Sequence, residues 1–481
     1  MTTRREFIGG AAVGAAAFPF GAWAAKPKAP NLSFGVVGPI EATRFDSWAE
    51  HLETVLRYFS AKGADAVLVV GDITKSGHIE EMESFANVWN KVFPGGRGSS
   101  GRKTELLAVT GDHDIVGWDG RWDGFSEDQL GQQKFSHADN PKKVWKWLFH
   151  MDWEPIWRKE IKGYAFIGAQ WPCPGQPPVA EYLAKHAGEL RGDKPFFFLS
   201  HRVPEEGAIS LSANAARSGG SDDEWAKAIS KFPNAVYIAG GYDHPSLADE
   251  RAVWQGAYTL LRTGCLSESL FSYDYENMSP HWEALTTQHV MSCDTAMVSQ
   301  GGGVEYVQVY DDHIKVHRLH VASGCKQTLG APWILPLPAK AGGEMSDEKR
   351  KSRRRAPQFS AGARLDVTFC PTGHPDLGPL FKGKPCLCVT IPRAKTNKVQ
   401  RSGESCRVYD YVVTAIADGG NPVVRRIAAP GASLPETMAN VPGRCVFLMS
   451  EFPEKKPIRF SVVPRDCFGL EGKAITKTFS P

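Results

Sequence analysis

Short runs of apolar residues recur from Phe34 to Gly241, and polar or turn-forming residues bound each of them. Both faces of these runs are apolar, a pattern that indicates strands buried between two layers. A helical pattern with its apolar residues on one face lies between the first two runs, from Phe45 to Lys62. Strand and helix in alternation predict an α/β sandwich. The predicted strands are Phe34 to Gly38, Ala66 to Asp72, Glu105 to Asp112, Tyr164 to Gln170, Phe196 to His201 and Ala235 to Gly241.

The pattern changes after about Val304, where one strand follows another without a helix between them. A polar, glycine-containing stretch at residues 339–357 then predicts a linker. Beyond it, residues 358–481 show short alternating strands separated by turn signals, which predict a small all-β sandwich. The segment from Arg459 to Lys473 resembles the last strands of fibronectin type III modules.

The first 24 residues have the features of an export signal. Arg4 and Arg5 precede a small, weakly apolar stretch, and Ala22-Trp23-Ala24 provides an Ala-x-Ala cleavage site. This order is typical of a twin-arginine signal peptide. The apolar stretch is shorter than the roughly 20 residues that a membrane-spanning helix needs. We therefore expect the twin-arginine machinery to export the protein to the periplasm or beyond, without a stable membrane span.

Composition and charge exclude some partners. The chain has 481 residues, of which 42% are hydrophobic and 23% charged, as in an ordinary folded protein. The formal net charge is +3, and the run from Lys349 to Arg355 alone holds six basic residues. We expect this run to be a solvated part of the linker. Because the rest of the chain is mildly acidic, no nucleic-acid partner is expected.

Ten cysteines in an exported protein allow disulfides. Four lie between Cys173 and Cys325 and six between Cys370 and Cys467. The even number in each part predicts bridges within each domain, although the spacing alone does not give their connectivity.

Polar residues with metal-ligating side chains end four of the predicted strands. Asp72 ends one strand, Asp112, His113 and Asp114 follow the next, and His201 and His244 come at or after two later ones. Ligands bind outside the carboxyl ends of strands in open α/β sheets, so these side chains are expected to converge. Carboxylates and imidazoles together suit manganese, iron or zinc. A pair of such ions can hold a phosphate and generate a hydroxide nucleophile.

The order of these strand ends resembles the calcineurin-like metallophosphoesterase superfamily, over residues 31–338. The resemblance implies a four-layer αββα sandwich with a dimetal centre at the strand ends. Asp72 matches the bridging aspartate, Asp112 stands where the family has asparagine, and His201 and His244 match histidine ligands. His113 matches the general acid that protonates the leaving group.

The sequence departs from the family pattern at two ligand positions. Pro39 stands at the position of the first aspartate and Glu41 at that of the first histidine, while Tyr242 replaces the first histidine of Gly-His-x-His. Glu41 and Tyr242 are substitute ligands that could restore the centre. One metal position keeps Asp72, Asp112 and His201, the three strong ligands that a catalytic metal needs, so the resemblance implies one or two ions. Lys75, in the loop after Asp72, is expected to be solvated.

Two functions follow as expectations. The first is an exported phosphoesterase that hydrolyses a small-molecule or polymeric phosphate mono- or diester by metal-activated hydroxide, with His113 as general acid. The alternative is a non-catalytic descendant that binds a ligand or an extracellular polymer, because Pro39, Glu41 and Tyr242 replace family ligands.

Overall fold

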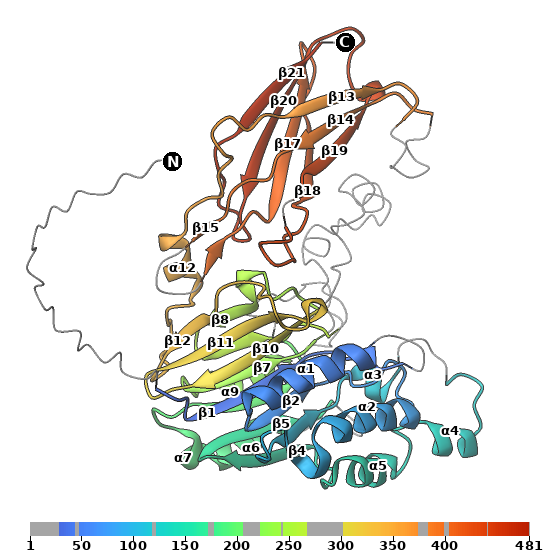
Figure 1. Cartoon of the computed structure of the whole chain (residues 1–481), viewed down its shortest axis with the longest axis vertical. Helices are drawn as coiled ribbons and strands as arrows, with labels where there is room; N and C mark the ends of the chain where they lie inside the picture. Colours follow the sequence, from blue (N-terminus) through green and yellow to red (C-terminus); the bar gives the residue numbers. More distant parts are fainter. Residues whose placement is uncertain are drawn as a thin grey trace, which may run out of the picture.

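The computed structural model of the chain describes residues 28–43, 48–117, 122–171, 178–204, 222–241, 244–266, 302–373, 383–398, 404–439 and 441–480. The predicted signal peptide at residues 1–24 and the substitute ligand Tyr242 lie outside these segments. Within the described segments, no helix is long and apolar enough to cross a membrane. Figure 1 shows an α/β part at the bottom of the view and an elongated all-β part above it.

The first large sheet has six strands in the order β12-β11-β10-β1-β2-β3. The three strands β1, β2 and β3 run parallel, so their carboxyl ends lie at one edge. The strands β10, β11 and β12 continue the sheet in antiparallel pairs beside β1. The bounds are β1 (Leu32–Val37), β2 (Ala66–Val70), β3 (Glu105–Val109), β10 (Gly303–Val309), β11 (His313–His320) and β12 (Trp333–Pro336).

The second large sheet also has six strands, in the order β4-β5-β6-β7-β9-β8. Its central strands β5, β6, β7 and β9 are parallel, and antiparallel strands flank them at both edges. The strands predicted from runs that are apolar on both faces are the parallel strands of the two sheets, apart from β9. The bounds are β4 (Ile156–Ile161), β5 (Tyr164–Ala169), β6 (Phe196–Ser200), β7 (Ala235–Ala239), β8 (Val253–Gln255) and β9 (Thr259–Arg262).

The two sheets face each other, and helices cover their outer sides. Phe34 of β1 contacts Phe166 and Phe197 of the second sheet, with ring centroids 5.5 and 4.9 Å apart. A second core joins the first sheet to α1 (Trp48–Lys62), α2 (Ile79–Val92) and α5 (Asn140–Phe149). A third joins the second sheet to α6 (Val179–Lys185) and α9 (Asp222–Ile229). These cores confirm the predicted αββα layers. The described segments of this part also contain three short helices: α3 (Asp112–Ile115), α4 (Glu127–Gln133) and α7 (Ala187–Leu190).

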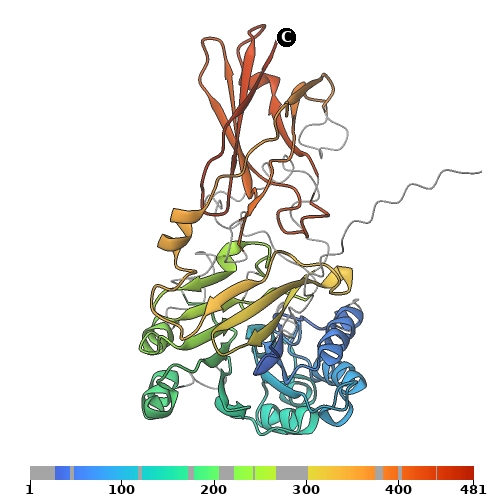
Figure 2. The same cartoon turned by 60° about the vertical axis from the view of Figure 1, so that its left-hand side comes forward.

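The predicted C-terminal all-β part is also confirmed. Two antiparallel sheets, in the orders β13-β14-β19 and β18-β17-β20-β21, pack their apolar faces on one core (Figure 2). Leu387 and Phe447 enter this core from one sheet, and Tyr411 and Phe460 enter it from the other. The bounds are β13 (Asp366–Cys370), β14 (Cys386–Ile391), β15 (Asn397–Lys398), β16 (Ser405–Cys406), β17 (Asp410–Ala417), β18 (Val423–Ala428), β19 (Gly443–Leu448), β20 (Ile458–Arg465) and β21 (Ile475–Phe479).

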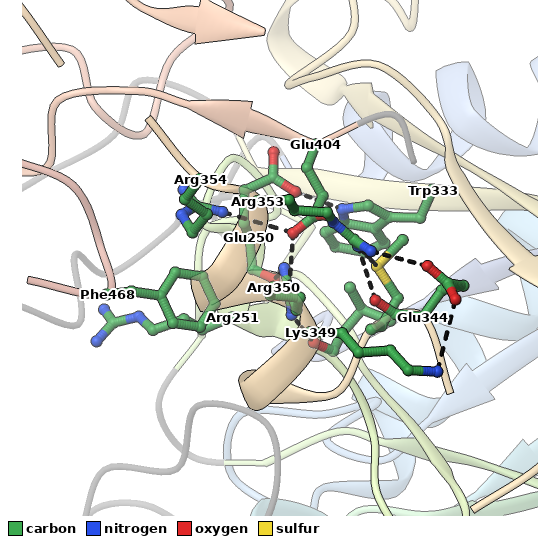
Figure 3. Close-up of polar contacts among 12 residues, drawn as sticks. Glu250, Arg251, Trp333, Glu344, Lys349, Arg350, Arg353, Arg354, Glu404 and Phe468 are labelled. Atoms are coloured by element: carbon green, nitrogen blue, oxygen red, sulfur yellow. Dashed lines mark hydrogen bonds and ion pairs between the residues drawn. The ribbon is translucent and has the colours of Figure 1, made fainter. Parts of the chain in front are cut away.

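The basic run is only partly solvated: Lys349, Lys351 and Arg355 are exposed as expected, whereas Arg350 and Arg354 are buried. It forms the helix α12 (Asp347–Arg353), and the side chains of Arg350 and Arg354 are 0% exposed. Figure 3 shows Arg350, Arg353 and Arg354 around the carboxylate of Glu404. Arg350 also donates to the carbonyl oxygen of Val253 in the α/β part, at 2.6 Å. Arg350 and Arg354 can be buried because acidic and carbonyl oxygens far away in the sequence pair with them.

Among the described cysteines, six have free thiols: Cys265, Cys325, Cys370, Cys406, Cys445 and Cys467. These six therefore do not form the bridges expected within each domain. Cys173 and Cys293 lie outside the described residues.

Candidate metal centre

Polar residues follow the carboxyl ends of four parallel strands, two in each large sheet. Asp72 follows β2, Asp112 follows β3, His201 follows β6 and His244 follows β7. Three of these side chains, those of Asp72, Asp112 and His201, place their ligand atoms within 4.8 Å of one another. The convergence expected at the carboxyl ends of the strands is therefore present for these three residues.

Asp72, Asp112 and His201 meet around one imidazole nitrogen. Nε2 of His201 lies 3.1 Å from Oδ2 of Asp72 and 3.2 Å from Oδ1 of Asp112. The side chains of His201 and Asp72 are 0% and 1% exposed, and that of Asp112 is 19% exposed. Apart from this ring nitrogen, neither carboxylate oxygen has a hydrogen-bond partner among the described residues.

The other nitrogen of His201 decides what this arrangement can bind. Nδ1 lies 3.0 Å from the carbonyl oxygen of Val70, which can only accept a hydrogen bond. The backbone N–H of Gly241 also approaches Nδ1, at 3.4 Å, but the Val70 oxygen is closer and needs a donor. We therefore place the hydrogen on Nδ1, so that in the neutral ring Nε2 points a lone pair at the oxygens of Asp72 and Asp112. Lone pairs that face one another in a buried site need a cation between them. Two carboxylates suit manganese, iron or zinc as ligands, and so does an imidazole whose other nitrogen is held by a backbone carbonyl oxygen.

The charges of the site shift the pKa values of these three groups. Burial raises the pKa of Asp72, but the charges of His201 and His113 outweigh it and hold this pKa well below its ordinary value. Burial and the charge of Asp72 both raise the pKa of Asp112. Burial lowers the pKa of His201, but the Asp72 charge and hydrogen bonds to both carboxylates raise it well above 6.5. In the metal-free protein a proton on Nε2 therefore occupies the place between the carboxylates.

We expect the stabilisation by manganese to increase with pH, because the metal ion has to displace the proton of His201. Because the pKa of His201 is higher in the folded than in the unfolded protein, protonation of His201 stabilises the metal-free fold. This stabilisation is complete below the unfolded-state pKa of about 6.5 and is lost as the pH rises through the folded-state pKa. Bound metal adds stability that grows with its affinity. The rise in melting temperature on adding Mn²⁺ to EDTA-treated protein should be larger at about pH 8 than at about pH 6. Thermal unfolding followed by circular dichroism measures this, and a smaller rise at the higher pH would contradict a ligand role for His201.

A second group of side chains shares Asp72 with the first. Oε1 of Glu41 lies 3.5 Å from Nδ1 of His113 and 3.4 Å from Nε2 of His244. The ligand atoms of Glu41, Asp72 and His113 lie within 4.8 Å of one another. The backbone N–H of His113 donates to Oδ1 of Asp72 at 3.0 Å. Asp72 thus offers one carboxylate to both groups.

Two loop residues change this second group from the family pattern. Pro39 brings no ligating side chain, and its carbonyl oxygen accepts a hydrogen bond from the backbone of Leu266 at 2.9 Å. Lys75 is not solvated as expected: it forms an ion pair with Oε2 of Glu41, and its side chain is 31% exposed. The sequence separates Lys75 from Glu41 by 34 positions, so no local pattern reveals the pair.

The backbone is strained at three residues of the site. Glu41, Asp72 and His244 have positive φ values of 49°, 49° and 35°. Such a conformation costs a non-glycine residue about 1–3 kcal/mol and is concentrated at functional sites. Two glycines allow the close approach of the ligands. A Cβ on Gly111 would lie 2.1 Å from Oδ1 of Asp72, and one on Gly71 would lie 2.3 Å from Nδ1 of His201.

Asp114 orients the loops rather than joining the metal-type groups. Its fully buried carboxylate accepts hydrogen bonds from the backbone N–H groups of Ile73 (3.2 Å), Thr74 (2.8 Å) and Gly111 (2.9 Å). These bonds tie the loop after β2 to the loop after β3. Together with the pairing of β2 and β3, these bonds fix the position of Asp72 relative to Asp112.

Replacing Asp114 with alanine should destabilise the metal-free protein by about 3 kcal/mol or more, because three buried N–H groups lose their acceptor. Asp114→Asn keeps one carbonyl oxygen and should cost less. Urea unfolding in the presence of EDTA measures both variants. Equal and small losses would show that the three backbone bonds do not hold the two loops.

Other supporting residues were not evident from the sequence. Gln170 accepts a hydrogen bond from the backbone N–H of Thr110 at 2.8 Å, just before the Gly111-Asp112 motif. The fully buried Arg262 donates to the carbonyl oxygen of Gly240 at 3.0 Å, beside the loop that leads to His244. The position of Gln170 at the end of a predicted strand was the one sequence signal that it could support the site. Nothing in the sequence distinguishes Arg262 from a surface arginine.

No protein-family model and no curated protein matches the chain. Among solved structures, a dimetal phosphatase from Danio rerio is 10% identical, with 60% of this chain and 95% of that chain covered and a TM-score of 0.34. A predicted phosphoesterase from Streptococcus pneumoniae is 12% identical, with coverages of 60% and 90% and a TM-score of 0.25. A purple acid phosphatase from yellow lupin seeds is 10% identical, with coverages of 61% and 53% and a TM-score of 0.37. At such low scores, the chemistry of the site has to follow from this chain's own residues.

Proposed function

We propose that the chain is an exported, metal-dependent hydrolase of phosphate mono- or diesters. The observation that carries the proposal is the convergence of Asp72, Asp112 and His201, in which two carboxylate oxygens face one imidazole nitrogen. A structural ion pair needs only one carboxylate. A second carboxylate at 3.2 Å adds repulsion that a bound cation removes.

An ion held by these three residues would supply positive charge to a phosphoryl oxygen and lower the pKa of a water molecule. Asp72 accepts a 3.0 Å hydrogen bond from the backbone N–H of His113 and would in this way hold His113 beside the ion. Glu41 faces Nδ1 of His113, which assigns proton donation to Nε2. His113 would then protonate the leaving oxygen of the ester as general acid.

The substrate class and the location are parts of the same proposal. Arg4 and Arg5 support export by the twin-arginine machinery, so the substrate would be a small-molecule or polymeric phosphate ester in the periplasm or beyond. Cell fractionation of the full chain and of a variant with Arg4 and Arg5 both replaced by lysine tests export. Equal amounts of both proteins outside the cytoplasm would contradict it.

The activity is tested with aryl phosphate mono- and diesters and added Mn²⁺, Zn²⁺ or Fe²⁺. Wild-type protein should show metal-dependent turnover, and Asp72→Asn should lose it, because the amide removes a charge from the metal position. No metal-dependent turnover above the Asp72→Asn control would contradict the proposal. Tight metal binding without turnover would instead favour the ligand-binding alternative, which the replacements at Pro39 and Glu41 support.

A further inference from the structure

Lys75 already supplies a cation to one half of the site. Its ammonium group forms an ion pair with Oε2 of Glu41, whose other oxygen faces His113 and His244. The Glu41 side chain is 13% exposed and that of Lys75 31%, so this charge pair is partly withdrawn from water. The half of the site that contains Glu41 is therefore neutralised by the chain itself.

The backbone fixes this ion pair in place. The N–H of Glu41 donates to the carbonyl oxygen of Asp72 at 2.9 Å, and the N–H of Lys75 donates to that of Ala42 at 3.0 Å. The N–H of Ala42 in turn donates to Ile73 at 3.0 Å. The loop that carries Glu41 and the loop that carries Lys75 are thus joined along their length. Little conformational freedom is lost when the two side chains meet, which makes the pair a built feature of the site.

The other half of the site differs in this respect. Among the described residues, Asp72 and Asp112 have no lysine or arginine partner, and His201 is the cationic group in contact with them. The two halves share Asp72, so a metal ion in one half lies close to any cation in the other. Two cations that lie close together in a buried site repel each other strongly.

We propose that the ammonium group of Lys75 takes the place of a second metal ion at Glu41, so that the centre holds one ion, at Asp72, Asp112 and His201. This inference rests on the metal site of the proposed function. Pro39 and Glu41 replace the ligands of the first family motif, and the ammonium group of Lys75 then provides the positive charge that a second ion would have provided. Lys75 is a positioning residue for Glu41 and, through it, for His113 and His244.

The test is the number of Mn²⁺ ions bound by EDTA-treated full chain, measured by equilibrium dialysis and elemental analysis, with no activity assay. Wild-type protein should bind one ion tightly. Lys75→Ala should bind a second ion at least about tenfold more tightly than wild type does, because a like charge is removed beside it. Lys75→Arg should keep one ion. Lys91→Ala is the matched control, since Lys91 also pairs with a glutamate, Glu53, but on the surface.

Each outcome separates this inference from the proposed function. Two tightly bound ions in wild type, or a single ion in Lys75→Ala with unchanged affinity for a second, would overturn the role of Lys75 and leave the hydrolase proposal intact. No bound ion in wild type would overturn both. Lys75→Met keeps the apolar stem and replaces the alanine variant if circular dichroism shows that the latter has lost its fold.

Discussion

Replacing His113 with glutamine should lower kcat for alkyl phosphate esters by about 10²- to 10⁴-fold, the contribution of a general acid to a hydrolytic step. An alkoxide leaves poorly unless it is protonated, and the hydrogen bond from the backbone of His113 to Asp72 holds the imidazole beside the metal position. A nitrophenolate leaves without help. The same variant should therefore lose much less activity on nitrophenyl phosphate.

Steady-state kinetics with leaving groups of graded pKa measure this difference, and elemental analysis should show unchanged manganese content. His137→Gln is a matched control, because His137 pairs with the exposed Glu127, at 3.5 Å, on the surface. An equal loss on all substrates together with lost manganese would show that His113 is a metal ligand rather than the acid.

Replacing Glu404 with alanine should destabilise the protein by about 3–5 kcal/mol, the loss expected when one partner of a buried ion network is removed. The carboxylate of Glu404 is 0% exposed and accepts from Nε of Arg350 at 2.6 Å and from Nε of Arg353 at 3.0 Å. Nη1 of Arg354 lies 3.5 Å away. Without Glu404, two fully buried guanidinium groups would lose a neutralising charge.

Urea unfolding in the presence of EDTA measures this loss. The matched control is Glu53→Ala, because Glu53 also pairs with two cationic side chains, Arg57 and Lys91, but on the surface. It should change the midpoint little, since exposed ion pairs contribute little. A similar shift for Glu53→Ala and Glu404→Ala would show that the network beside α12 does not stabilise the junction of the two parts.

The layers of the fold could be predicted because their signals are local. Runs that are apolar on both faces, such as Ala66 to Val70, indicate strands buried between layers, and the structure has β2 there. Asp72 and Asp112 were expected to converge because they follow neighbouring parallel strands of one sheet, β2 and β3. His201 follows β6 of the second sheet and joins them because the two sheets face each other.

The expectations that the basic run and Lys75 are solvated were wrong where the partners of these charges are distant in sequence. Arg350 lies in a run that any local measure scores as solvated, yet Glu404, 54 positions away, makes it part of a core. Lys75 and Glu41 meet only because two loops are joined by backbone bonds. Residue type and spacing give the sign of such charges but not their partners, so the sequence could not reveal either burial or pairing.

Asp72, Asp112 and His201 should together hold a metal ion. Crystals of the protein soaked in Mn²⁺ and measured for anomalous scattering test it most directly. We expect a strong anomalous peak within coordination distance of Oδ2 of Asp72, Oδ1 of Asp112 and Nε2 of His201. Crystals saturated with Mn²⁺ that show no peak between these three atoms, or a peak only beside Glu41, would contradict a metal site at Asp72, Asp112 and His201.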